Sequence, residues 1–208
     1  MTLNEHEGEL TSTTLLTKPL TIVQLSDLIE AYGDDQVLQG ELANFTCSRN
    51  ADVESFLHQH ALRFEKAHKS RTYLAVNETT LESESTDLEI IGYFTLSLKH
   101  LNLGEAISKS RRKELHGLFV PLGNVVVGYL IGQLAKNDLY RGAAIGDQLL
   151  DAALGILRDQ AQRAVGGRFV IIECAQQEKL LQFYQRNGFN LLQVDIEDEM
   201  AQLIRRIA

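Results

Sequence analysis

The stretch from Val125 to Leu150 constrains the fold most, because its pattern changes from strand to helix across a turn of small residues. An apolar run from Val125 to Ala135, broken only by two glycines and a glutamine, predicts a buried strand. The next apolar residues recur at three- and four-residue spacing and predict an amphipathic helix: Ile145, Leu149, Leu150, Ala153, Leu154 and Leu157. A strand, a small-residue turn and a helix N-terminus together form an anion site, because free backbone N–H groups and the positive end of the helix dipole meet there.

The whole chain predicts one α/β domain, a mixed sheet flanked by helices, with the first 19 residues as a flexible or peripheral extension. Residues 20–31 fit either a strand or a helical turn, and Asp52–Lys66 predicts a helix capped by Asn50 or Asp52. The remaining expected elements are strands at Arg71–Val76, Ile90–Leu98, Arg168–Cys174 and Phe189–Val194, a helix at Gln176–Arg186 ended by Gly188, and a last short element at Met200–Ile207.

Composition narrows the partners and the compartment. The net charge of −8 argues against broad nonspecific binding to nucleic acid or to an anionic membrane. No apolar run approaches the roughly 20 residues that a membrane helix needs, so no membrane partner is expected. The polar, acidic N-terminus does not resemble a secretory signal. Two distant cysteines, Cys47 and Cys174, form no framework of pairs, which predicts a reducing, cytoplasmic environment.

The stretch from Lys99 to Lys113 differs from the acidic background of the chain. Its basic residues are Lys99, Lys109, Arg111, Arg112 and Lys113. Two interpretations stay open for it. The stretch is either a solvated helix face or connector, or a mobile flap that contacts an anionic substrate or the phosphates of a cofactor.

Three sequence features occur together and carry a family resemblance. The predicted central strand ends in Gln133-Leu134-Ala135-Lys136-Asn137, an Arg141-x-x-Ala144-x-Gly146 turn follows, and Phe183-Tyr184-Gln185-Arg186-Asn187-Gly188-Phe189 comes about 40 residues later. Together they resemble the GCN5-related N-acetyltransferase (GNAT) superfamily, whose acyl-CoA turn is Gln/Arg-x-x-Gly-x-Gly/Ala. Ala144 replaces the usual glycine of that turn. Residues 45–76 resemble the first helix and second strand of a subgroup that includes toxin-like acetyltransferases.

The resemblance implies a fold and a co-substrate site. The fold is a mostly antiparallel sheet whose central strand splays from its neighbour, in one acyl-CoA N-acyltransferase domain over residues 1–208. The main chain of Leu134, Ala135 and Lys136 would then bind the amides of the pantetheine arm of acetyl-CoA. The backbone amides of the following residues would hold the pyrophosphate: Arg141, Gly142, Ala143, Ala144, Ile145 and Gly146. The Arg141 side chain either contacts a phosphate or faces solvent.

The resemblance also implies a chemical role for Tyr184. In the family, the hydroxyl at this position donates a proton to the departing thiolate, and a phenol suits that role because it is neutral at pH 7. The alternative is that the ring of Tyr184 only packs in the core. The acceptor amine would lose its proton to a carboxylate, for which Glu173 is the candidate, or to ordered water.

No metal site is predicted. His58 and His60 are two residues apart on a helix and point to different sides, so they do not chelate one ion; His60 is expected on the buried face and His58 in solvent. Cys174 ends an apolar strand and is expected to pack in the core rather than to act as a nucleophile.

The predicted function is acetyl transfer from acetyl-CoA to a primary amine of a small molecule or peptide, by direct attack in a ternary complex. One alternative is a toxin-like enzyme that acetylates the amino group of an aminoacyl-tRNA, which the net charge of −8 disfavours. A second alternative is a noncatalytic acyl-CoA-binding regulatory module. The exposed edge expected for the C-terminal strand is compatible with a homodimer.

Overall fold

The computed structural model describes residues 20–77, 88–117, 124–140, 144–195 and 197–207. The strands are β1 (Thr21–Gln24), β2 (Arg71–Val76), β3 (Ile90–Asn102), β4 (Val125–Lys136), β5 (Phe169–Cys174), β6 (Asn190–Val194) and β7 (Ala201–Arg206). The helices are α1 (Leu25–Tyr32), α2 (Asp35–Leu42), α3 (Ala51–Gln59), α4 (Ala61–Lys66), α6 (Lys109–His116), α7 (Ala144–Ile156), η1 (Leu157–Ala161), α8 (Gln162–Val165) and α9 (Glu178–Arg186). The expected N-terminal extension lies outside the described residues.

The strands form one sheet in the order β1-β2-β3-β4-β5-β7-β6. Every neighbouring pair is antiparallel except β4 and β5, which confirms the mixed, mostly antiparallel sheet. Residues 20–31 contain both of the structures that their pattern left open, because β1 runs directly into α1. The expectation that the C-terminal strand forms an exposed edge is wrong. β7 lies inside the sheet, hydrogen-bonded to β5 and β6, and β6 forms that edge.

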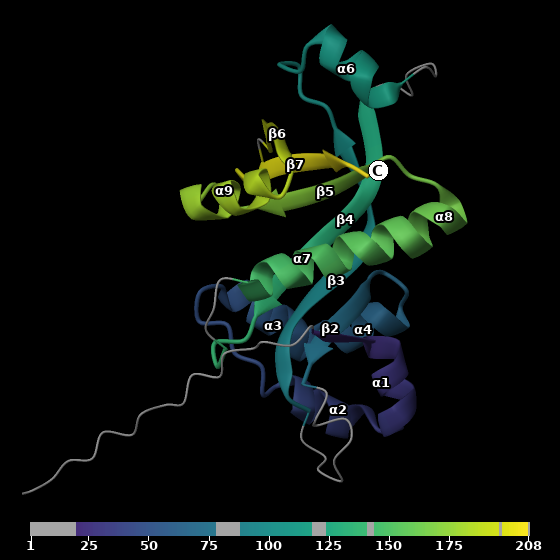
Figure 1. Cartoon of the computed structure of the whole chain (residues 1–208), viewed down its shortest axis with the longest axis vertical. Coiled ribbons are helices and arrows are strands. Elements are labelled where there is room, and N and C mark those ends of the chain that lie inside the picture. The colour runs from purple at the N-terminus through teal and green to yellow at the C-terminus, as the bar shows by residue number, and fades with distance from the viewer. Residues whose placement is uncertain (1–19, 78–87, 118–123, 141–143, 196, 208) are drawn as a thin grey trace, which may run out of the picture.

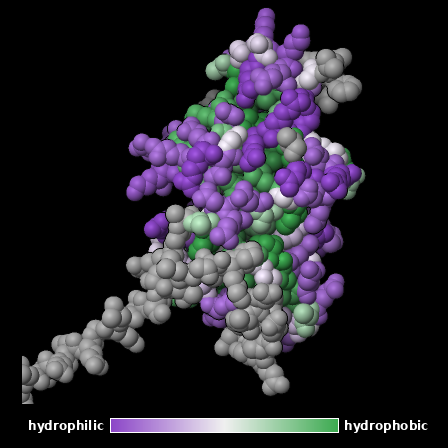
Figure 2. Space-filling model, in the orientation of Figure 1, coloured by the Kyte–Doolittle hydropathy of each residue, from purple (hydrophilic) through white to green (hydrophobic). Residues whose placement is uncertain are grey.

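Helices cover both faces of the sheet and divide its apolar residues into three clusters. On one face α7 and α9 pack with residues of β3, β4 and β5. On the other face α1–α4 cover β2 and the adjoining end of β3, while α6 covers the far end of β3 with β5 and β7. Figure 1 shows α7 crossing in front of the long strands β3 and β4, with α1–α4 below it and α6 above. In Figure 2 hydrophilic side chains cover most of this outer layer.

The prediction of one helix over Asp52–Lys66 is wrong, because the chain breaks at His60 into α3 and α4. The break turns Leu62 and Glu65 inward, where the buried carboxylate of Glu65 accepts the Thr72 N–H at 2.7 Å. Asn50 caps α3 as predicted, with its side chain accepting two first-turn N–H groups. His58 is not in solvent as expected: it is half-buried, with Nε2 2.8 Å from the carbonyl oxygen of Phe45.

Candidate active site

The parallel strands β4 and β5 separate soon after they meet. They pair only at Tyr129–Val170 and Leu130–Ile171, although β4 continues to Lys136 and β5 to Cys174. The backbones of the C-terminal halves of the two strands therefore diverge, and we call the region between them the opening. This confirms the splayed central pair implied by the family resemblance.

A β-bulge in β4 coincides with the start of this opening. Thr95 of β3 pairs with Gln133 and its neighbour Leu96 pairs with Ile131, so Gly132 is the extra residue in β4. The N–H of Gln133 donates to the Thr95 hydroxyl at 2.9 Å. Since a bulge bends its strand and increases the local twist, it turns β4 away from the line of β5.

Replacing Thr95 by valine is expected to lower the free energy of unfolding by about 1–3 kcal/mol, because the part-buried Gln133 N–H then loses its acceptor, the hydroxyl of the buried Thr95. Thr95→Ser keeps the hydroxyl and is the matched control. Urea denaturation of the three proteins measures the difference. A valine variant as stable as the wild type would show that the hydroxyl does not support the bulge.

Beyond the bulge, β4 turns main-chain groups toward the opening. The Asn137 N–H donates to the Ile91 carbonyl at 2.8 Å, which identifies these two residues as a hydrogen-bonded pair. Because such pairs alternate along an antiparallel ladder, Ala135 turns its N–H and C=O toward β3, whereas Leu134 and Lys136 turn theirs toward the opening. Of the three residues predicted to bind pantetheine, Leu134 and Lys136 thus present main-chain groups there, and Ala135 does not.

The first turn of α7 follows at the same end of β4. Ala144 is exposed, Gly146 is half-exposed and the side chain of Ile145 is buried in the core. The N–H groups of this first turn have no partner inside the helix, so they can bind an anion. Arg141, Gly142 and Ala143, also predicted to hold the pyrophosphate, lie outside the described residues.

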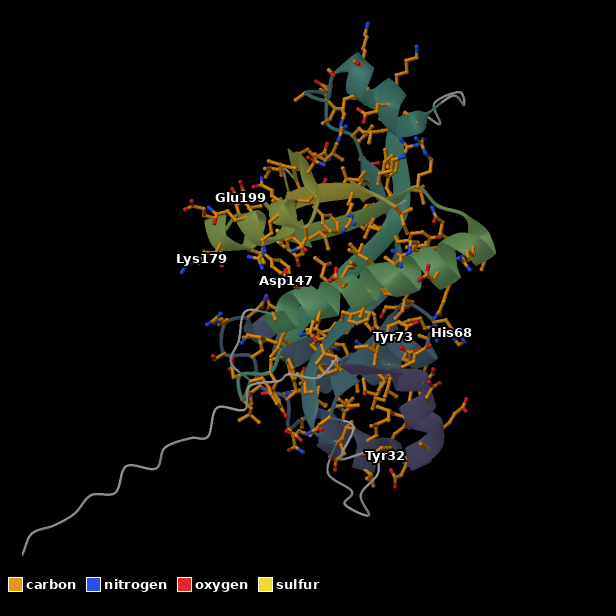
Figure 3. All side chains as sticks on the ribbon, viewed as in Figure 1. Tyr32, His68, Tyr73, Asp147, Lys179 and Glu199 are labelled. Atoms are coloured by element: carbon orange, nitrogen blue, oxygen red, sulfur yellow. The ribbon has the colours of Figure 1, made fainter. Side chains whose placement is uncertain are left out.

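A polar link joins the start of α7 to the end of α9. The Asp147 carboxylate accepts from Arg186 at 2.8 Å and from the Asn187 side chain at 2.9 Å. These donors, the Asn187 amide first and Arg186 second, lower the pKa of Asp147. Figure 3 places Asp147 between the two helices. The link fixes the first turn of α7 relative to the helix that carries Tyr184.

Tyr184 is buried on the face of the sheet that α7 covers. Its ring meets those of Phe183 and Phe189 edge-on, with centroids 5.0 and 5.8 Å away, and it shares a cluster with Ile172 and Cys174 of β5. Its hydroxyl has no hydrogen-bond partner in the described part of the chain. Burial, with a smaller contribution from nearby Cys174, raises the pKa of Tyr184, so the phenol holds its proton at neutral pH.

The end of α9 has the geometry that its sequence predicts. Gly188 has φ +81°, and the Phe189 N–H donates to the Tyr184 carbonyl at 3.0 Å. The positive φ suits glycine, as expected for the residue that follows a helix. This turn brings Phe189 back against the Tyr184 ring and fixes the orientation of that ring.

Glu173 lies on the opposite face of β5 from Tyr184, as the alternation along the strand predicts. Its carboxylate accepts from Lys99 at 2.7 Å and from the Gln202 side chain at 2.9 Å. Gln202 is buried, and the Glu173 side chain is 19% exposed. Tyr184 and Glu173 therefore flank the same region of β5 from the two faces of the sheet.

Neither a metal cluster nor a reactive cysteine accompanies these residues in the part of the chain that the structure describes. The described residues contain no group of three or more His, Cys, Asp or Glu side chains that could hold a metal ion. Cys174 is buried as predicted, and burial raises the pKa of its thiol to about 11, which suits packing rather than nucleophilic attack. Among the helices that the structure describes, none has the length and apolarity to cross a membrane.

Comparison with solved structures identifies the fold. A tyrosine-to-phenylalanine variant of KacT is 25% identical over 91% of this chain and 96% of its own, with a TM-score of 0.66. AtaTR bound with acetyl-CoA is 25% identical over 91% and 94%, with a TM-score of 0.64. AtaT complexed with acetyl-methionyl-tRNAfMet is 24% identical over 88% and 93%, with a TM-score of 0.63. No family model and no curated protein matches the sequence. The chain has the GNAT fold and is similar over most of its length to these structures.

Proposed function

We propose that this chain, an acyl-CoA-dependent acetyltransferase with the GNAT fold, transfers an acetyl group from acetyl-CoA to the amino group of an aminoacyl-tRNA. The observation that carries the proposal is the opening between β4 and β5, with the first turn of α7 and a buried, protonated Tyr184 on one of its faces. This arrangement provides an anion site, main-chain groups for amides and a proton donor.

The residues present fit acetyl-CoA as a substrate. The free main-chain groups of Leu134 and Lys136 pair with the amides of the pantetheine arm as a short additional strand. The amides at the start of α7 hold the pyrophosphate. The thioester then lies in the opening, between the face that carries Tyr184 and the face that carries Glu173.

The reaction proceeds by direct attack. The neutral acceptor amine forms a C–N bond with the thioester carbonyl carbon, and the C–S bond breaks as the tetrahedral adduct collapses. Tyr184 gives its phenolic proton to the departing thiolate. The proton lost by the amine passes to Glu173 or to water, and solvent restores the proton of Tyr184. The products are the N-acetylated acceptor and free coenzyme A.

The aminoacyl-tRNA acceptor replaces the small amine as the first choice of substrate. AtaT, over nearly its full length, shares this fold and has been solved with acetyl-methionyl-tRNAfMet. The net charge of −8 favours the second candidate, a small-molecule or peptide amine. However, the charge is unevenly distributed, since the stretch from Lys99 to Lys113 holds five basic residues and one acidic residue.

An acceptor screen with the purified full chain and labelled acetyl-CoA tests this function. Label is expected in charged tRNA and absent from the same tRNA after its amino acid has been removed. Alkaline hydrolysis should then release the label as an N-acetyl amino acid. Label in small amines or peptides but not in charged tRNA would select the second candidate. Binding of acetyl-CoA without transfer to any acceptor would indicate the noncatalytic module.

A further inference from the structure

The helix α6, with the sequence KSRRKELH, is the centre of a basic surface in an acidic chain. We call this the α6 surface, and its members are Lys99, Lys109, Arg111, Arg112, Lys113 and Arg168. Lys109 and Lys113 are exposed and have no acidic partner among the described residues. Arg111 pairs with Glu114 on the same helix at 2.7 Å, and Lys99 pairs with Glu173.

The two other arginines of the α6 surface donate hydrogen bonds to uncharged acceptors, so no acidic group that the structure describes neutralises their charge. Arg112 donates to the carbonyl oxygens of Gly104 at 2.6 Å and Ile107 at 2.9 Å, and to the side-chain oxygen of Asn124 at 2.7 Å. Arg168 donates to the carbonyl oxygen of Leu115 at 2.8 Å. These acceptors are all uncharged, so a positive potential persists on this surface although the whole chain is acidic.

The α6 surface lies on the Glu173 side of the sheet. Leu115 of α6 packs in one cluster with Phe169 and Ile171, which share a face of β5 with Glu173. Tyr184 and the first turn of α7 lie on the opposite face. Because acetyl-CoA would occupy that opposite face, we expect the acceptor to approach from the face that carries Glu173.

The part of β4 that packs against α6 lies several residues before the opening. Val126 packs in the cluster of Leu115, and the bulge at Gly132 lies six positions further, or about 20 Å along an extended strand. A small amine at the opening therefore cannot touch α6. A polymeric acceptor can touch both, and a phosphate backbone matches the charge of the α6 surface.

Resting on the function proposed above, we propose that the α6 surface binds the phosphate backbone of the acceptor tRNA, whose aminoacyl end enters the opening from the Glu173 side. Exposed lysines act here through their charge, and each neutralised phosphate releases counterions. Lys99 pairs with Gly128 of β4, between Val126 and the bulge, so the Lys99–Glu173 pair forms the part of this surface nearest the opening, where the aminoacyl end would pass.

Reversing two exposed charges of α6 tests the proposal. The double variant Lys109→Glu/Lys113→Glu is expected to raise the KM for aminoacyl-tRNA about tenfold or more and to reduce the slope of log KM against log salt by about two. Its kcat and its KM for acetyl-CoA should not change. The matched control is Arg63→Glu/Lys69→Glu, on α4 and in the connection that follows it, which changes the net charge equally. Both of these cations contact Phe64 and lack an acidic partner among the described residues.

The outcomes separate this proposal from the one on which it rests. If the wild type acetylates aminoacyl-tRNA and the α6 variant has the same KM, the α6 surface is not the tRNA site and the proposed function stands. An equal rise of KM in the α4 control would show an effect of overall charge and would also overturn the proposal. If the wild type acetylates no aminoacyl-tRNA, both proposals fail. Thermal unfolding of each variant verifies that it is folded.

Discussion

Tyr184→Phe is expected to lower kcat by about 10²- to 10⁴-fold, the usual contribution of a positioned general acid. The KM for acetyl-CoA and the free energy of unfolding should hardly change, because the hydroxyl has no hydrogen-bond partner among the described residues and the ring contacts remain. Steady-state kinetics and urea denaturation measure the two effects separately. An unchanged kcat would show that Tyr184 only packs in the core, on the face of the sheet that α7 covers.

The control for this variant is Tyr129→Phe, which removes the hydroxyl of another buried tyrosine. Tyr129 donates to the Gly166 carbonyl, away from the opening, so its loss should affect stability rather than kcat. The pH profile gives an independent test in the wild type. We expect kcat/KM, measured by rapid quench, to rise with pH as the acceptor amine loses its proton. Because burial raises the pKa of Tyr184, kcat/KM should not fall as the pH reaches 10.0, where an ordinary phenol is half ionised.

Ala144→Glu is expected to weaken acetyl-CoA binding about tenfold to 100-fold through repulsion between the new carboxylate and the pyrophosphate. The same carboxylate should leave stability unchanged or raise it by about 0.3–1 kcal/mol, since a negative charge is favourable in the first turn of a helix. Ala144 is exposed, so the larger side chain meets no core residue. Calorimetry with acetyl-CoA and thermal unfolding therefore give effects of opposite sign.

Ala51→Glu makes the same substitution at the first residue of α3, where Ala51 is also exposed. Acetyl-CoA should bind this control as it binds the wild type. If Ala144→Glu also retained full affinity, the start of α7 would not be the pyrophosphate site. The interpretation of the small-residue turn would then have to be abandoned.

Local sequence patterns predicted the parts of the site that depend on neighbours in the chain. The apolar run of β4, the spacing along α7 and the glycine after α9 each reflect a local rule, and all three elements are present. The helix α2 was missed, although Asp34 caps it and Leu38 and Leu42 are buried four residues apart. A short helix with one buried pair gives too weak a periodicity to be distinguished from a loop.

The features that long-range contacts determine could not be predicted from local patterns. At the bulge the Gln133 N–H donates to the Thr95 hydroxyl of another strand, and the Asp147 link joins residues about 40 positions apart. Likewise, the break at His60 accompanies a contact between Glu65 and Thr72 of β2, seven positions away in the sequence. The position of β7 between β5 and β6 is a property of the folded sheet, since β6 comes first in the sequence.

That strand order bears on when the enzyme first becomes active during its own synthesis. A nascent chain that has emerged as far as β6 already contains every residue assigned to the site, but β5 still lacks the six residue pairs that join Phe169–Cys174 to β7. The strand β5, one wall of the opening, is then paired only with β4, at two positions, and its other edge is free to pair wrongly. Assembly of the site therefore waits for residues 201–206, the last strand of the sheet to be synthesised.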